Sequence, residues 1–368
     1  MSLPEPDFIQ RDPVVVTAEI IAQYEQITRK TLYPAQVERI LIDIISYRET
    51  LIRIGIQEAA KQNLLSFARA PMLDYLGELV GVTRLQPQNA LIALRISVAT
   101  PMATAAFVDG GTRVTSNDGA IQFSLNERVE IPAGQLYVDT KATCAVVGVI
   151  GNGWQLGQIN QWYDDPGNPN LTVLNTSISS GGTEVEDDEH LRESIRLAPE
   201  AFSTAGSRGA YKYHALRSHQ DIVDVAVITP SPGVVALYPL TKNALPTEEI
   251  LSLVSAACSA DRVRPLTDHV VALAPTQISY EINATIKVLK TSDISDVQKN
   301  VLSAANMYAQ ERSSALCLDI VPSQLIAALQ VNGVYQVNLI SPTHLVLQVH
   351  EWAKCTNIQI TVDGVMND

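Results

Sequence analysis

The sequence predicts a multidomain α+β protein with an N-terminal helical arm, a central β-rich domain and a C-terminal pair of α+β modules. A chain of 368 residues exceeds the usual size of a single hydrophobic core. The apolar period is three to four residues at first, changes to two near Leu91, and alternates between the two in the last third. The boundaries we expect are 1–85 for the arm, 86–182 for the β-rich domain and 183–368 for the modules, divided at about 183–290 and 291–368.

The arm is predicted from three helical segments. Residues 1–16 carry three prolines and are expected to be extended, followed by a helix from Thr17 to Thr31. The next helix is amphipathic and, if unbroken to Phe67, about 45 Å long. A short helix over 71–82 closes the arm, with Pro71 in the first turn and Gly81 at the C-cap.

The long helix carries more apolar surface than so small a unit can bury. Its main stripe consists of Val37, Ile40, Leu41, Ile44, Ile45, Leu51, Ile52 and Ala59. Other apolar side chains lie off this stripe, so a second side of the helix also needs a cover. We therefore expect contacts with other proteins here, and the interface residues predicted are Ile42, Ile54, Leu64, Leu65 and Phe67, together with Arg208 near the start of a later helix.

The β-rich domain is predicted from alternating apolar and polar residues between turn signals. Segments such as LIALRISVAT (91–100) alternate between Gly, Asn, Asp and Pro turns. Asn117–Asp118–Gly119 is a hairpin signal within it.

In the C-terminal region the helical period returns at residue 183. Thr183 and Glu186 have the spacing of a capping box for a helix that ends at Leu197. Further helices are expected over 247–259 and 293–310. QDIVDVAVITP (220–230) aligns with NGVYQVNLISP (332–342), each after a helical stretch, which predicts two modules built on one plan.

Charge and composition exclude several classes of function. Lys and Arg number 26 against 39 Asp and Glu, and this net charge of −13, with no basic patch, argues against nucleic-acid binding. The first 16 residues lack the basic start and apolar core of a signal peptide, and no uncharged apolar run is of membrane-spanning length, so we expect neither export by a signal peptide nor membrane insertion. The four cysteines are far apart and are expected to be small buried hydrophobes.

The sequence also predicts no catalytic, cofactor-binding or metal-binding residues. The glycine-rich stretch 151–157 is wrongly spaced for a dinucleotide fingerprint and is expected to be a β-turn. The acidic run 184–189 fits a helix N-terminus better than a metal site. The six histidines form no H-x-x-x-H pair, and no G-x-S-x-G elbow is present. We therefore expect neither an enzyme nor a small-molecule substrate.

Several motifs, in the same order along the chain, resemble the baseplate J family of contractile phage tails and related particles. The first is LDYLG (73–77), at the end of a helical segment. The second is DEHLRESI (188–195), followed by AGSRGAYKYHA (205–215) and IVDVAVITPSPG (222–233). The third is VRPLTDHVVA (263–272) with YEINAT (280–285). The region 86–180 is absent from the shortest members of that family and present in longer ones.

The resemblance implies a structural baseplate wedge subunit in the virion tail, assembled in the host cytoplasm. Its expected partners are other copies of itself and other wedge and hub proteins, in an inner ring around the tail hub that takes part in triggering sheath contraction. An alternative is a receptor- or carbohydrate-binding tail protein that uses the β-rich domain, with Trp154, Trp162 and Tyr163 as a stacking surface. A tail-tip hydrolase would need converging acid and base residues that the sequence does not show.

Overall fold

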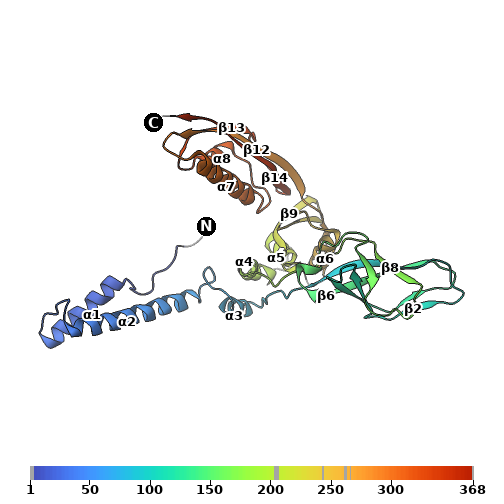
Figure 1. Cartoon of the computed structure of the whole chain (residues 1–368), viewed down its shortest axis with the longest axis horizontal. Coiled ribbons are helices and arrows are strands. Elements are labelled where there is room, and N and C mark those ends of the chain that lie inside the picture. The colour runs from blue at the N-terminus through green and yellow to red at the C-terminus, as the bar shows by residue number, and fades with distance from the viewer. Residues whose placement is uncertain (1–3, 203–206, 243, 261–262, 266, 367–368) are drawn as a thin grey trace. The chain divides into compact units, whose positions relative to one another are not determined.

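The structure is a computed structural model that describes residues 4–202, 207–242, 244–260, 263–265 and 267–366. It confirms a multidomain α+β fold (Figure 1). The chain forms two compact units, one of residues up to Arg84 together with 187–196, and one of 85–186 together with the rest. Parts of two resemblance motifs, at 205–206 and 266, lie outside the described residues.

The first helix, α1 (Pro13–Thr28), begins earlier than expected. Asp12 is its N-cap, because the Asp12 carboxylate accepts a hydrogen bond from the Val14 amide at 2.8 Å. Pro13 occupies the first helical position, where its missing N–H costs nothing. The predicted start at Thr17 is therefore wrong. Asp12 and Pro13, which we expected to lie in an extended segment, cap and begin the helix.

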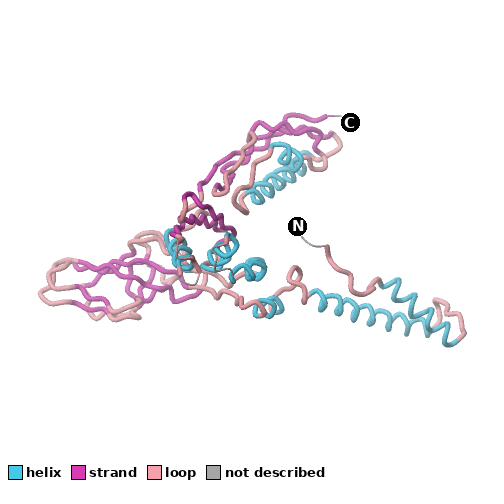
Figure 2. Tube along the Cα trace, turned by 180° about the vertical axis from the view of Figure 1, so that it is seen from behind, coloured by secondary structure: helices cyan, strands magenta, loops and turns pink. Residues whose placement is uncertain are grey.

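The long helix, α2 (Val37–Lys61), runs for 25 residues beside α1, as two views agree (Figures 1 and 2). It ends at Lys61, before Phe67, and the chain continues in turns after Gln62. The short helix α3 (Met72–Glu78) follows Pro71, and Gly81 has a positive φ of 73° just beyond it. The helix expected over 71–82 therefore ends earlier than predicted, with Leu79 as its C-cap, while the positive φ of Gly81 is a conformation that favours a residue without a Cβ.

The β-rich region folds into an antiparallel six-stranded sheet of order β7-β3-β4-β6-β1-β8, plus a two-stranded β2-β5 ribbon. The first and last strands of that order contact each other, so the sheet curls almost into a barrel. The predicted turn at Gly119 joins β3 to β4, and its φ is +70°. The strands are β1 (Asn89–Val98), β2 (Ala106–Val108), β3 (Arg113–Ser116), β4 (Gln122–Leu125), β5 (Val129–Ile131), β6 (Tyr137–Val147), β7 (Ile159–Trp162) and β8 (Leu171–Asn175).

The glycine-rich stretch after β6 forms the short 3₁₀ helix η1 (Val149–Gly151) and turns, and no α-helix follows it. Gly153 and Gly157 both have positive φ, at 82° and 79°. The prediction of a turn in place of a dinucleotide site is confirmed by this backbone, because a phosphate-binding fingerprint requires a helix to begin there.

The helix expected from a capping box is α4 (Asp188–Leu197), followed by η2 (Ala198–Phe202). It ends where predicted but begins later, because the carboxylate of Asp187 accepts from the His190 amide and caps it. Glu186 is instead buried, and its carboxylate accepts from the Leu85 amide at 2.7 Å. The Thr183–Glu186 capping box is therefore wrong. The helix itself packs in the unit that contains α1, α2 and α3.

The remaining chain forms two three-stranded mixed sheets with their helices. The first has order β11-β10-β9 and the second β13-β12-β14. Both copies of the predicted repeat form a strand after a helix, but 344–349 forms no strand where the first copy has β10, so the two modules differ. The elements are α5 (Arg208–Ser218), β9 (Ile222–Ser231), β10 (Val234–Thr241), α6 (Glu248–Ser259), β11 (His269–Ala272), β12 (Thr276–Leu289), α7 (Ile294–Arg312), α8 (Pro322–Leu329), β13 (Val334–Ser341) and β14 (Glu351–Met366).

The cysteines follow the expectation of burial only in part. Cys144 and Cys258 are buried, Cys355 is half-buried and Cys317 is exposed. Burial raises the pKa of the Cys258 thiol to about 12. The prediction of four buried cysteines is wrong for Cys317, because it lies at a positive-φ turn outside the regular elements.

This difference predicts an order of thiol alkylation in the folded protein. Iodoacetamide at pH 8 is expected to modify Cys317 first and Cys258 last, because the thiolate is the nucleophile and must be both formed and reachable. Mass spectrometry of tryptic peptides over a time course measures the order. Labelling of Cys258 as fast as that of Cys317 in the native protein would contradict the packing described here.

Candidate interaction surface

The side of α2 that is buried by α1 and the N-terminal segment is largely polar. The buried residues of α2 are Ile42, Ser46, Thr50 and Gln57. Gln57 binds the segment before α1 in both directions, since its amide nitrogen donates to the Pro6 carbonyl at 2.6 Å and its oxygen accepts from the Phe8 amide at 2.9 Å. Hydrogen bonds of Gln57 therefore hold the N-terminal segment against α2.

The opposite side of α2 is apolar and exposed. Eight side chains make up this surface, the α2 stripe, and each keeps between 45% and 71% of its surface accessible: Val37, Ile40, Leu41, Ile44, Ile45, Leu51, Ile52 and Ile56. Soluble proteins rarely leave so continuous an apolar face in water, because burying it gains roughly 25 cal/mol per Å². The α2 stripe is therefore a candidate surface for contact with another molecule.

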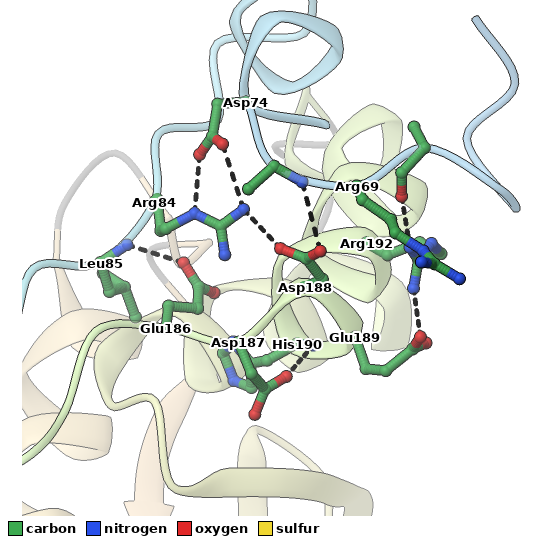
Figure 3. Close-up of polar contacts among 12 residues, drawn as sticks. Arg69, Asp74, Arg84, Leu85, Glu186, Asp187, Asp188, Glu189, His190 and Arg192 are labelled. Carbon is green, nitrogen blue, oxygen red and sulfur yellow. Dashed lines mark hydrogen bonds and ion pairs between the residues drawn. The ribbon is translucent and has the colours of Figure 1, made fainter. Parts of the chain in front are cut away.

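A polar joint connects the end of the arm to α4 (Figure 3). Arg84 lies between two carboxylates, donating to Asp74 at 2.7 Å and to Asp188 at 2.8 Å. Asp188 also accepts from the Ala70 amide at 3.2 Å. The two carboxylates raise the pKa of the Arg84 guanidinium, chiefly through the Asp74 hydrogen bond. The joint thus ties together residues 104 positions apart in the sequence.

Arg192 completes this joint from the next turn of α4. Its side chain is only 8% exposed and donates to the carbonyl of Leu65 at 2.8 Å and to that of Ala68 at 2.6 Å. Its third contact is an ion pair with Glu189, which is exposed. A planar guanidinium suits this role, because it can reach two backbone carbonyls and a carboxylate at once.

Close packing accompanies these polar contacts. Leu73 is fully buried. Gly77 lies so close to its neighbours that a Cβ there would be 2.6 Å from the Val82 carbonyl oxygen and 3.3 Å from the Ile195 side chain. The LDYLG and DEHLRESI motifs are therefore two halves of one joint. Sequence reasoning identified both motifs but gave neither Asp74, Arg84 nor Arg192 a partner, since spacing within each motif cannot show which distant segment it meets.

The residues predicted for an interface are not brought together. Ile42 is only 5% exposed and lies on the buried side of α2, so its assignment to an interface with another protein needs correction. Ile54 and Leu64 are exposed, while Leu65 and Phe67 are half-buried in the turns after α2. Arg208 is exposed at the first residue of α5. The main apolar stripe predicted for the long helix is the side of α2 that is exposed.

The aromatic side chains of the β-rich domain do not form a shared stacking surface. Trp154 and Trp162 pack against the core of the sheet, and the Trp162 indole donates to the Leu171 carbonyl at 2.9 Å. Tyr163 is exposed, with the Arg113 guanidinium 4.4 Å from its ring centroid. These contacts give the two tryptophans a structural role.

Two further features bear on function. Among the described residues, no three or more His, Cys, Asp or Glu side chains are grouped as a metal ion would require. In the same part of the chain, none of the helices has the length and apolar character needed to span a bilayer.

Comparison with known proteins places the chain in one family. It matches four models in order: the Baseplate J-like N-terminal domain over 39–90, the Baseplate J-like protein barrel domain over 94–182, the Baseplate J-like central domain over 203–274 and the Baseplate J-like protein C-terminal domain over 280–361. It is 32% identical over 185 residues to baseplate protein J of Escherichia phage P2, an alignment that spans 49% of this chain and 60% of that protein.

A chain in the cryo-EM structure of the anti-feeding prophage baseplate, 6-fold symmetrised, aligns with 93% of this chain and 90% of its own length, at a TM-score of 0.44 and 14% identity. The family models together account for most of the sequence, including the LDYLG motif and the β-rich region. The resemblance seen in the motifs is confirmed, and the chain belongs to the baseplate J-like family.

Proposed function

We propose that this protein is a structural, non-enzymatic subunit of the baseplate of a contractile phage tail or tail-like particle. Membership of the baseplate J-like family supports the location. The exposed α2 stripe is the observation that carries the mechanical role, because soluble proteins rarely leave such a face uncovered and faces of this kind mark sites of contact with other proteins. The chain is assembled into the virion in the host cytoplasm.

The stripe suits a bundle of helices. Its apolar residues recur at three- and four-residue spacing over 20 positions of α2, the pattern with which helices interlock side by side. We infer that the arm packs with helices of other wedge and hub proteins and of further copies of this chain. The C-terminal modules then contribute to an inner ring around the tail hub, which rearranges when sheath contraction is triggered.

Two charges placed in the stripe are expected to abolish this assembly. The double substitution Ile40→Asp and Leu41→Asp puts carboxylates where a partner must exclude water and where no basic side chain of α2 lies three or four residues away, and burying an unpaired charge costs several kcal/mol. The full-length variant, co-expressed with the other tail proteins of its particle, should remain soluble and folded yet be missing from sedimented baseplates and leave none visible by electron microscopy.

The matched control carries the same two charges outside the stripe, at Leu156 and Val346, which are also exposed apolar side chains. Leu156→Asp with Val346→Asp should enter baseplates as the wild type does. Normal incorporation of the Ile40→Asp/Leu41→Asp protein would contradict the proposed role of the arm.

A further inference from the structure

A single cation interrupts the α2 stripe. Arg48 is exposed, and the positions three and four residues before and after it, which a helix brings to its side, are Ile44, Ile45, Leu51 and Ile52. No carboxylate of α2 is therefore placed to pair with it. Within the described residues, Arg48 has no hydrogen bond or ion pair to any other part of the chain.

The other basic residues of α2 are paired. Arg39 lies 3.0 Å from Asp43, Arg53 2.9 Å from Glu49, and Lys61 3.0 Å from Glu58. Each has its acidic partner three or four residues away on the same helix. Arg48 differs because its neighbours at that spacing are all aliphatic, and the helix keeps this guanidinium available.

Covering the stripe would bury this guanidinium, which is unfavourable unless the covering molecule supplies hydrogen-bond acceptors, and a carboxylate supplies both the acceptors and the opposite charge. A second copy of α2 cannot do so while it covers the stripe. In-register parallel pairing sets Arg48 against Arg48. Antiparallel pairing that brings Glu38 to Arg48 leaves Leu51, Ile52 and Ile56 beyond the start of the partner helix, and antiparallel pairing that brings Glu58 there leaves the stripe residues from Val37 to Ile44 beyond its end. The helix that faces Arg48 therefore belongs to a different protein, even where copies of this chain join the same bundle.

Gly55 adds a second constraint on that helix. It lies seven residues after Arg48, hence at the same place on the stripe, and a Cβ built there meets nothing within 4 Å. The surface is recessed at this point, so a large apolar side chain can approach the backbone closely. A matching helix carries a carboxylate and, about two turns along, a bulky aliphatic or aromatic residue.

We propose that Arg48 selects the partner of the arm: an amphipathic helix of another protein whose apolar face carries one carboxylate that pairs with it. This inference rests on the proposed function, because it names what the α2 stripe binds. Arg48 acts on specificity as a single polar residue does in a coiled coil, where it fixes partner and register at some cost in affinity.

The test uses the full-length chain and three synthetic amphipathic helical peptides. They are identical in their apolar face except for one central residue, which is Glu, Leu or Lys. Fluorescence anisotropy of labelled peptide gives each Kd. The wild type should bind the Glu peptide at least tenfold more tightly than the Lys peptide and more tightly than the Leu peptide. Arg48→Glu should reverse the Glu–Lys order, and Arg48→Met should favour Leu.

Arg39→Glu is the matched control, because Arg39 is already paired within α2 and lies off the stripe. It should leave the order of the three peptides unchanged. Equal binding of all three by the wild type, or an order that Arg48→Glu does not alter, would overturn the role of Arg48 and leave the proposed function standing. Failure of every peptide to bind would overturn helix docking itself, and both proposals with it.

Discussion

Replacing Arg192 by alanine is expected to lower the free energy of unfolding of the arm and α4 by about 2–5 kcal/mol. The substitution removes the donors to the carbonyls of Leu65 and Ala68, and a buried acceptor left without a donor costs roughly 1–3 kcal/mol. It also removes a side chain that fills the space between α4 and the turns after α2. Arg84 and its two carboxylates would remain, so the joint should loosen rather than vanish.

Hydrogen exchange measured by mass spectrometry on the full-length chain tests this locally. Amides of 65–84 and 188–197 should exchange roughly thirtyfold faster or more, while those of β12 and β14 should not change. Arg196→Ala is the control, because Arg196 on the same helix is exposed and, among the described residues, pairs with Glu193 alone. That variant should change stability by less than about 1 kcal/mol. Equal effects of both substitutions would show that Arg192 does not hold the joint.

Replacing glycine by alanine is expected to destabilise the protein at Gly77 and to stabilise it at Gly55, although both residues lie in helices of the same unit. Gly77→Ala should destabilise the joint by about 1–3 kcal/mol, because the added methyl group would lie 2.6 Å from a backbone oxygen that cannot move freely. Gly55→Ala should stabilise α2 by about 1 kcal/mol in the unassembled chain, since nothing lies near the new methyl group and alanine favours the helix.

Thermal unfolding followed by circular dichroism, together with hydrogen exchange in 37–61 and 65–84, distinguishes the two effects. The comparison controls for the lower backbone entropy of the unfolded chain, because replacing glycine by alanine reduces that entropy equally at both sites. If Gly77→Ala stabilised the protein, α3 could not lie as close to the Val82 carbonyl and the Ile195 side chain as described. A destabilising Gly55→Ala would mean that the stripe is covered in the free protein.

The periodicity of the sequence was sufficient for the class of fold and for most elements. A three- to four-residue period located α2, a two-residue period located the β-rich region, and Gly81 and Gly119 marked turns that require positive φ. These predictions succeeded because each depends on residues that are close together in the sequence. Where two local signals competed, as at Asp12 and Thr17 or at Asp187 and Thr183, the choice of cap was wrong, since spacing alone does not say which side chain the backbone amides reach.

By itself, the sequence determined that the arm carries an apolar stripe on α2 and that the LDYLG and DEHLRESI segments mark a family. Only the tertiary structure decided that α1 covers the polar side of α2 and leaves that stripe exposed, that Ile42 is on the covered side, and that Arg84 and Arg192 join the two motifs. The reason is physical: a helical pattern fixes which side chains share a face, whereas which face is buried depends on segments that fold back from far along the chain.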